Sequence, residues 1–200
     1  MFIVNLTIAD WMTLCGHALV WTAIWCSLHG KLQYAISLLL IAMLIDALDG
    51  MVARRLGVAR PFGRYLGSLV DLINYTVAPP LLLWKLGFSG PEAFAVLLIY
   101  STCGMLRLAR FNEIGNIQQD GQLAYLGLPV FWVHFVLMGL YVTFTFAEPV
   151  VARGVTAGAL LLLAFCFLLN RPFWKPQNYV VIAVVTLAAA AWFALLGYNA

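Results

Sequence analysis

The chain has 200 residues, about the length of one domain, but its composition is not that of a soluble one. Hydrophobic residues make up 64% of the sequence and charged residues only 10%. Soluble domains are roughly half apolar and about a quarter charged, and a globule of this size has too little interior to bury the excess. These figures exclude a soluble globule, a disordered chain and a disulfide-rich secreted module. The net charge of +3 gives no reason to expect a nucleic-acid partner.

Apolar segments long enough to cross a bilayer follow one another along the chain. A hydrocarbon core about 30 Å thick needs roughly 20 residues of helix. Three uncharged runs reach that length only if nearby aspartates or an arginine lie within the helices or at their ends. The predicted spans are residues 11–29, 34–54, 66–88, 92–110, 126–147, 151–169 and 178–198. We therefore expect an all-α integral membrane protein: a single domain over residues 1–200 and a polytopic bundle of about seven helices, within a range of six to eight.

Two features interrupt these spans. Pro79 and Pro80 lie inside the third predicted helix, where prolines kink or break a helix. The longest connection, from about residue 111 to 125, is polar and is interpreted as a loop.

Basic residues concentrate in alternate connections, which predicts the orientation of the helices. Eight basic residues lie in the connections after the second, fourth and sixth helices, against three in the others. Cytoplasmic loops carry the excess of Lys and Arg. We therefore expect an integral protein of a bacterial-type inner (cell) membrane, with the N-terminus and the richer set inside. The richer set is Arg54, Arg55, Arg60, Arg64, Arg107, Arg110, Arg171 and Lys175; the poorer set is Lys31, Lys85 and Arg153.

Three aspartates lie inside or at the edge of predicted spans. An ionised aspartate near the centre of a spanning helix costs roughly 2.5–3.5 kcal/mol, so each needs a cation, a basic partner or water. Asp46 and Asp49 are three residues apart and share a helix face, while Gly63, Gly67 and Asp71 recur at a spacing of four on the next helix. Oxygen ligands without His or Cys suit Mg²⁺, Mn²⁺ or Ca²⁺, and such ions beside arginines typically hold phosphates.

Each candidate also has a purely structural interpretation. The aspartates would then form intramembrane salt bridges with Arg54, Arg55 and Arg64. Arg107 and Arg110, three apart on the fourth helix, are candidates for binding a phosphate or carboxylate, or are ordinary positive-inside anchors.

One stretch resembles a family signature. Residues 46–54 read Asp-Ala-Leu-Asp-Gly-Met-Val-Ala-Arg, and Gly63 follows after eight further residues. This string resembles the signature of the CDP-alcohol phosphotransferases, D-x2-D-G-x2-A-R-x8-G-x3-D-x3-D, with all fixed residues present through Gly63. Segments 62–83, 103–112, 125–129 and 168–176 look like the corresponding parts of membrane phosphatidylserine synthases. The resemblance implies a six-helix core with a cytoplasm-facing polar cavity, a homodimer, and transfer from a CDP-linked lipid donor to a small alcohol or amino-acid acceptor with release of CMP.

The resemblance also assigns roles. It implies that Asp46, Asp49 and Asp71 bind Mg²⁺ or Mn²⁺ and that Asp71 is the general base. The nucleotide would lie against Thr13, Asp46, Asp49, Gly50, Ala53 and Arg54, and Arg107 and Arg110 would bind substrate phosphate or carboxylate. Membrane lipids are the expected surroundings.

The chain departs from the family pattern at two positions. Gly67 stands where the third aspartate of the signature belongs, and Asp10 stands where an asparagine often precedes the threonine. An alternative register with Tyr75 as the fourth position needs a four-residue insertion and loses neighbouring matches, so it is rejected.

Three functions remain open. The first is an enzyme that transfers a phosphatidyl-type group to a serine-like hydroxyl. The second is a degenerate member that binds nucleotide or lipid without efficient catalysis, as the loss of a carboxylate at Gly67 suggests. The third, a small transporter or channel lined by the aspartates, is disfavoured by the register of the signature.

Overall fold

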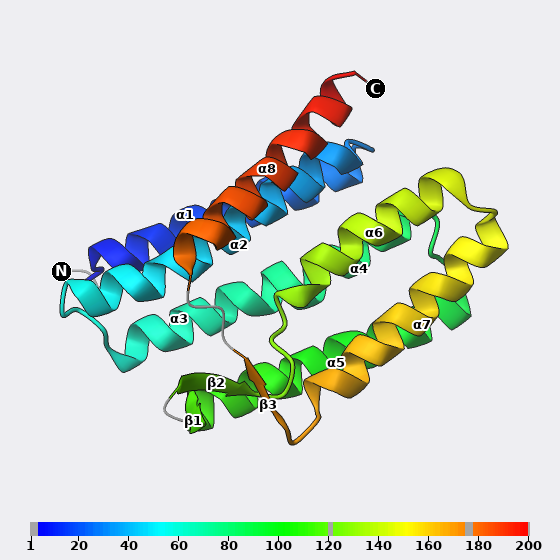
Figure 1. The fold of residues 1–200 in the computed structure, drawn as a ribbon. Coiled ribbons are helices and arrows are strands. Elements are labelled where there is room, and N and C mark those ends of the chain that lie inside the picture. Colours follow the sequence, from blue (N-terminus) through cyan, green and yellow to red (C-terminus); the bar gives the residue numbers. More distant parts are fainter. Residues whose placement is uncertain (1–3, 120–121, 175–177, 200) are drawn as a thin grey trace.

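The computed structural model describes residues 4–119, 122–174 and 178–199 and is a bundle of long helices (Figure 1). Six helical stretches in this part of the chain are long and apolar enough to cross a membrane, and α6 is a shorter apolar helix of 15 residues. The predicted fold class is therefore confirmed. The helices are α1 (Ile8–Leu28), α2 (Leu32–Arg55), α3 (Pro61–Asp71), the π-helix η1 (Leu72–Val77), α4 (Ala78–Leu86), α5 (Pro91–Ile114), α6 (Trp132–Phe146), α7 (Pro149–Phe167) and α8 (Tyr179–Tyr198).

Helix α1 begins three residues before its predicted start because Asp10 belongs to its cap. The Thr7 hydroxyl accepts a hydrogen bond from the Asp10 amide, and the Asp10 carboxylate accepts one from the Thr7 amide at 2.7 Å. This reciprocal capping box satisfies amides that a helix start leaves without partners. The carboxylate of Asp10 therefore caps the start of α1.

The two prolines produce a π-helical turn within one continuous helical stretch, where the sequence predicted a kink or break. Pro79 and Pro80 have no amide hydrogen, so carbonyls in the preceding turn lose their donors. Segment η1 lies directly before them and joins α3 to α4, and the Ala78 amide still bonds to the carbonyl of Ile73. Single π turns inside α-helices occur frequently at functional sites.

Side chains from two neighbouring helices occupy the carbonyls that the prolines leave free. Two hydroxyl groups of α5 donate to carbonyls of η1, and a ring nitrogen of an α6 histidine lies within hydrogen-bonding distance of a third. The π turn is thus held by α5 and α6, and its conformation depends on tertiary contacts. The pairs are Tyr100 with Tyr75, Ser101 with Thr76, and His134 with Asn74.

A small antiparallel sheet, which the sequence did not predict, lies at one end of the bundle. Its strands are β1 (Ile117–Gln119), β2 (Gln122–Leu126) and β3 (Pro172–Trp174), in the order β1-β2-β3. Strand β2 pairs with β3, so the connection from α5 to α6 lies beside the connection from α7 to α8 (Figure 1). The strands belong to connecting segments. The β1–β2 pairs are local, whereas the β2–β3 pairs join residues far apart in the chain.

The predicted basic connections gather at the end of the bundle where the sheet lies. Arg60, just before α3, forms an ion pair of 2.6 Å with Asp10 at the start of α1. The Ser68 hydroxyl of α3 donates to the side chain of Asn112 near the end of α5 at 2.8 Å. Lys175, the last of the predicted basic set, lies outside the described residues.

The opposite end is tied together by Arg153 of α7. Its guanidinium donates to the carbonyls of Gly87 and Ser89, in the connection between α4 and α5, at 3.1 and 2.7 Å. The connections therefore alternate between the two ends of the bundle, as the charge pattern predicted.

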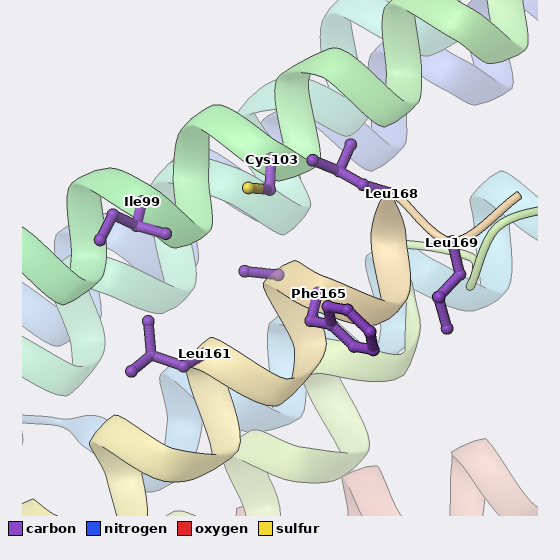
Figure 2. A pocket seen from close by; sticks show the side chains of 7 residues that line it. Ile99, Cys103, Leu161, Phe165, Leu168 and Leu169 are labelled. Carbon is purple, nitrogen blue, oxygen red and sulfur yellow. The ribbon is translucent and has the colours of Figure 1, made fainter.

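Helices α1, α2 and α8 form one side of the bundle, and α5 and α7 lie together on the other (Figure 1). The Ser37 hydroxyl of α2 donates to the carbonyl of Ala190 in α8 at 2.8 Å. Large apolar side chains cover the outer surface, as a hydrocarbon environment requires. An open apolar groove of about 320 Å³ lies between α5 and α7, and its lining includes Ile99, Cys103 and Phe165 (Figure 2).

Candidate functional site

Two of the predicted carboxylates meet where α2 packs against the junction of α3 and η1. The side chains of Asp46 and Asp71 lie close enough to interact with each other. The hydroxyl of Tyr75, in η1, donates to Oδ2 of Asp46 at 3.0 Å. Oδ1 of Asp71 is buried and has no hydrogen-bond partner among the described residues. The structure thus brings the fourth aspartate of the signature to the first, across two helices.

The third carboxylate, Asp49, lies one helical turn along α2 and faces α1. The hydroxyl of Thr13 donates to Oδ2 of Asp49. Thr13, Asp46 and Asp49 line a small cavity between α1, α2 and α3, together with the buried Asn74. The cavity volume is about 10 Å³, which is room for about one water molecule and far less than a nucleotide needs.

Arg107 supplies a positive charge on the α5 side of the site. Its guanidinium interacts electrostatically with Asp71. The guanidinium carbon lies 5.1 Å from the ring centroid of Phe111 and 5.5 Å from that of Tyr125, a cation–π arrangement. Arg107 is only 6% exposed, which places it inside the bundle and excludes a surface anchor. Arg110 instead lies on the exposed surface and forms an ion pair with Glu113.

The nucleotide-binding candidates lie along the last turns of α2. Gly50 and Ala53 are half-buried, and Arg54 is exposed. Arg54 folds back along the helix, because its Nη1 would lie 3.4 Å from a β-carbon added at Gly50. The guanidinium therefore stands directly over the glycine that follows Asp49. Arg54 and Arg110 are both on the solvent-facing part of the bundle end.

The two glycines of α3 have different surroundings. A β-carbon at Gly63 would lie 3.2 Å from Oδ1 of Asp10, so the small residue makes room for that carboxylate. Asp10 is 2% exposed and is bound by Arg60 and Thr7. A β-carbon at Gly67 would meet no heavy atom within 4 Å. The structure therefore has open space where the third aspartate of the signature would project.

The donor set of the site fits a hard divalent cation by its chemistry. Carboxylate oxygens are the ligands that Mg²⁺ and Mn²⁺ prefer, and the partnerless Oδ1 of Asp71 is an acceptor that a cation would satisfy. Among the described residues, no three His, Cys, Asp or Glu side chains stand close enough together to hold a metal ion. The ion pairs among the described residues join Asp10 to Arg60 and Glu113 to Arg110. Within this part of the chain, Asp46, Asp49 and Asp71 therefore have no basic side chain at ion-pair distance.

Tyr75 is the residue of this site that the sequence did not reveal. The signature register that fits the neighbouring residues ends at Asp71 and leaves Tyr75 outside the motif. Its position four residues before Pro79 was the available signal, since a π turn rotates the residues that follow Asp71 relative to those before it. Phe111 and Tyr125, which flank Arg107, were also missed; Phe111 follows Arg107 at the helical spacing of four.

The sequence pattern of the family described as CDP-alcohol phosphatidyltransferase matches residues 6–158. The chain belongs to this family. The matched range contains α1 to α6, with all three site carboxylates and Arg107.

Several curated relatives of this chain bear the name CDP-diacylglycerol–serine O-phosphatidyltransferase. The one from Methanocaldococcus jannaschii is 32% identical over 82% of this chain and 63% of its own length, and the one from Bacillus subtilis is 29% identical over 76% and 81%. An archaetidylserine synthase from Methanothermobacter thermautotrophicus is 30% identical over 80% of this chain and 68% of its own length. The chain thus spans less than two thirds of the Methanocaldococcus protein.

Proposed function

We propose that this protein is an integral membrane transferase that moves a phosphatidyl group from CDP-diacylglycerol to the hydroxyl of serine and releases CMP. The observation that carries the proposal is the meeting of Asp46 and Asp71, beside Asp49, in the order of the family signature. The names of the relatives from Methanocaldococcus and Bacillus support serine as the acceptor.

In the proposed reaction Asp71 is the general base. Its carboxylate accepts the proton of the serine hydroxyl as the serine oxygen attacks the phosphorus that carries diacylglycerol. A bond forms between that phosphorus and the serine oxygen, and the bond from the same phosphorus to the bridging pyrophosphate oxygen breaks. CMP leaves with the electron pair. Arg107 balances the charge of Asp71 and attracts the phosphate or the serine carboxylate.

Asp46 and Asp49 would hold a divalent ion, Mg²⁺ or Mn²⁺. Asp71 would be a third ligand after a small movement, because the three carboxylates do not yet stand close enough together to hold an ion. When bound, such an ion neutralises pyrophosphate charge and stabilises the leaving group. Mg²⁺ sites in proteins commonly use one or two carboxylates, with substrate phosphates completing the shell. Thr13 orients Asp49 by its hydrogen bond. Arg54, whose guanidinium lies over Gly50, would supply positive charge to a nucleotide beside Gly50 and Ala53.

We further propose that the basic end of the bundle faces the cytoplasm of a bacterial-type cell and that the protein works as a homodimer. The charge asymmetry of the connections supports the orientation. CDP-linked donor and serine would then reach the site from the cytoplasmic side.

A degenerate family member that binds a CDP-lipid without efficient transfer is the second candidate. The open position at Gly67 favours it, because a carboxylate that completes the metal site of the family is missing there.

An acceptor screen tests the proposal. Purified protein in mixed micelles receives CDP-diacylglycerol, Mn²⁺ or Mg²⁺, and one of serine, glycerol 3-phosphate or inositol, and CMP release is measured. Serine-dependent CMP release supports the transferase. CDP binding without CMP release for any acceptor supports the degenerate binder, and preference for another acceptor contradicts the assignment of serine.

A further inference from the structure

Tyr75 connects the two helices that carry the site carboxylates, although the proposed chemistry does not use it. Its side chain is 1% exposed, and its hydroxyl donates to Oδ2 of Asp46 at 3.0 Å. Tyr75 follows Asp71 by one turn, so the hydrogen bond joins the segment of Asp71 to α2. The hydroxyl of Tyr75 therefore does more than fill space in the core, because it bonds directly to a site carboxylate.

Contacts on other sides of Tyr75 fix the direction of its ring. The ring of His134 lies against it with centroids 4.9 Å apart, and the hydroxyl of Tyr100 donates to the Tyr75 carbonyl. The π turn sets the rotation of the residue relative to Asp71. Three elements, η1, α5 and α6, therefore hold the hydroxyl at Asp46.

The missing carboxylate at Gly67 on α3 makes the orientation of the remaining carboxylates more important. A carboxylate at Gly67 would help define the metal site, and none is present. A carboxylate without firm support rotates freely, and a ligand that must be ordered on binding loses affinity. A charge-assisted hydrogen bond from a buried hydroxyl removes that freedom.

We propose that Tyr75 is a positioning residue that occupies Oδ2 of Asp46 and leaves its other oxygen oriented for a divalent cation and the pyrophosphate of the donor. The inference rests on the proposed function, since it assumes that Asp46 meets these ligands. Tyr75 acts through Asp46 and does not itself touch the reacting atoms.

The test compares two single-atom deletions in the full-length protein. Tyr75→Phe removes the hydroxyl that bonds to Asp46, whereas Tyr100→Phe removes an equally buried hydroxyl that bonds to the same π turn without touching a carboxylate. Electron paramagnetic resonance measures Mn²⁺ binding in the presence of CDP, and thermal unfolding measures stability. We expect Mn²⁺ affinity to fall about tenfold in Tyr75→Phe, the range of a hydrogen bond to a charged group. It should fall less in Tyr100→Phe, because that variant removes one of the donors that hold the π turn but keeps the hydroxyl that bonds to Asp46.

Making Tyr75→Phe in a protein that already carries Asp46→Ala separates a positioning role of the Tyr75 hydroxyl from a packing role. In Asp46→Ala, the further change Tyr75→Phe should leave Mn²⁺ affinity where it is, because its partner is gone. Equal Mn²⁺ affinity in the wild type and Tyr75→Phe overturns the inference alone, as does an equal loss in Tyr75→Phe and Tyr100→Phe. A wild type that binds no Mn²⁺ with CDP overturns the proposed function and the inference together.

A second measurement applies if Tyr75→Phe does not fold. 3-Fluorotyrosine placed at position 75 keeps the hydroxyl and reports on its surroundings by ¹⁹F resonance. Addition of diamagnetic Mg²⁺ with CDP should shift this resonance, because a cation at Asp46 withdraws electrons from the hydrogen bond. An unchanged resonance at saturating Mg²⁺ and CDP contradicts the inference.

Discussion

Restoring a carboxylate at Gly67 is the most informative change to the site. A β-carbon there meets no heavy atom within 4 Å, so the side chain of Gly67→Asp begins in open space. Gly67 precedes Asp71 by four residues, which places the two about 6 Å apart along the helix axis. At an effective dielectric constant of about 20, two unit negative charges at this separation repel by about 2.8 kcal/mol. That figure is an upper limit, because Gly67 is only half-buried and water screens the pair.

The same repulsion becomes an attraction toward a divalent cation between the two carboxylates. We therefore expect Gly67→Asp to lower thermal stability without metal and to gain more stability from Mn²⁺ than the wild type does. Affinity for Mn²⁺ should rise by about tenfold, equivalent to 1.4 kcal/mol. Calorimetric titration with Mn²⁺, with and without CDP, measures this gain.

Gly67→Asn is the matched control, because it has nearly the same size without the negative charge. It should leave Mn²⁺ affinity close to that of the wild type. Lost Mn²⁺ binding in a folded Gly67→Asp protein would contradict this expectation and show that the face of Gly67 does not point to the metal. Tighter Mn²⁺ binding without CMP release from CDP-diacylglycerol would favour the degenerate binder.

Two further predictions concern the roles of the carboxylates and the sidedness of the bundle. Asp49→Asn should weaken binding of Mn²⁺ and CDP more than Asp71→Asn does, because Asp71 is assigned mainly to proton transfer; equal losses by calorimetry would show that the roles are wrongly divided. Single cysteines introduced as Ala59→Cys and Asn116→Cys into a cysteine-free background should react with a membrane-impermeant thiol reagent from the cytoplasmic side, and Ser89→Cys from the opposite side. Ala59→Cys and Asn116→Cys reacting from different faces would overturn the placement of the site.

The apolar runs and the spacing of charged residues predicted the features that depend on a single helix. The apolar runs predicted the helices, but α3 begins at Pro61, five residues before the predicted start of its span, and α6 begins at Trp132, six residues after its predicted start. The interval of three between Asp46 and Asp49 correctly placed both at the face of α2 that lines the small cavity. The same rule predicted less well for Arg107 and Arg110. Three residues turn a helix by about 300°, and the remaining 60° separates a buried guanidinium from an exposed one.

Features that depend on contacts between distant segments were not predictable from the pattern. Strands β2 and β3 pair across almost fifty residues of sequence, and each is too short to give a periodic signal. The contact of Tyr75 with Asp46 needs the π turn, and that turn needs Pro79 together with the hydroxyl donors of α5. A one-dimensional pattern contains the prolines but not the donors that replace their missing amides.

We propose that Asp46, Asp49 and Asp71 form one site in which a CDP-lipid transfers its phosphatidyl group to serine. The most direct measurement follows radiolabelled serine and CMP together in vesicles that contain the purified protein, CDP-diacylglycerol and Mn²⁺. We expect one CMP for each phosphatidylserine formed, and at least a hundredfold slower formation of both products in Asp71→Asn, the scale of a lost general base. CMP release that does not depend on serine, or an Asp71→Asn protein as fast as the wild type, would contradict it.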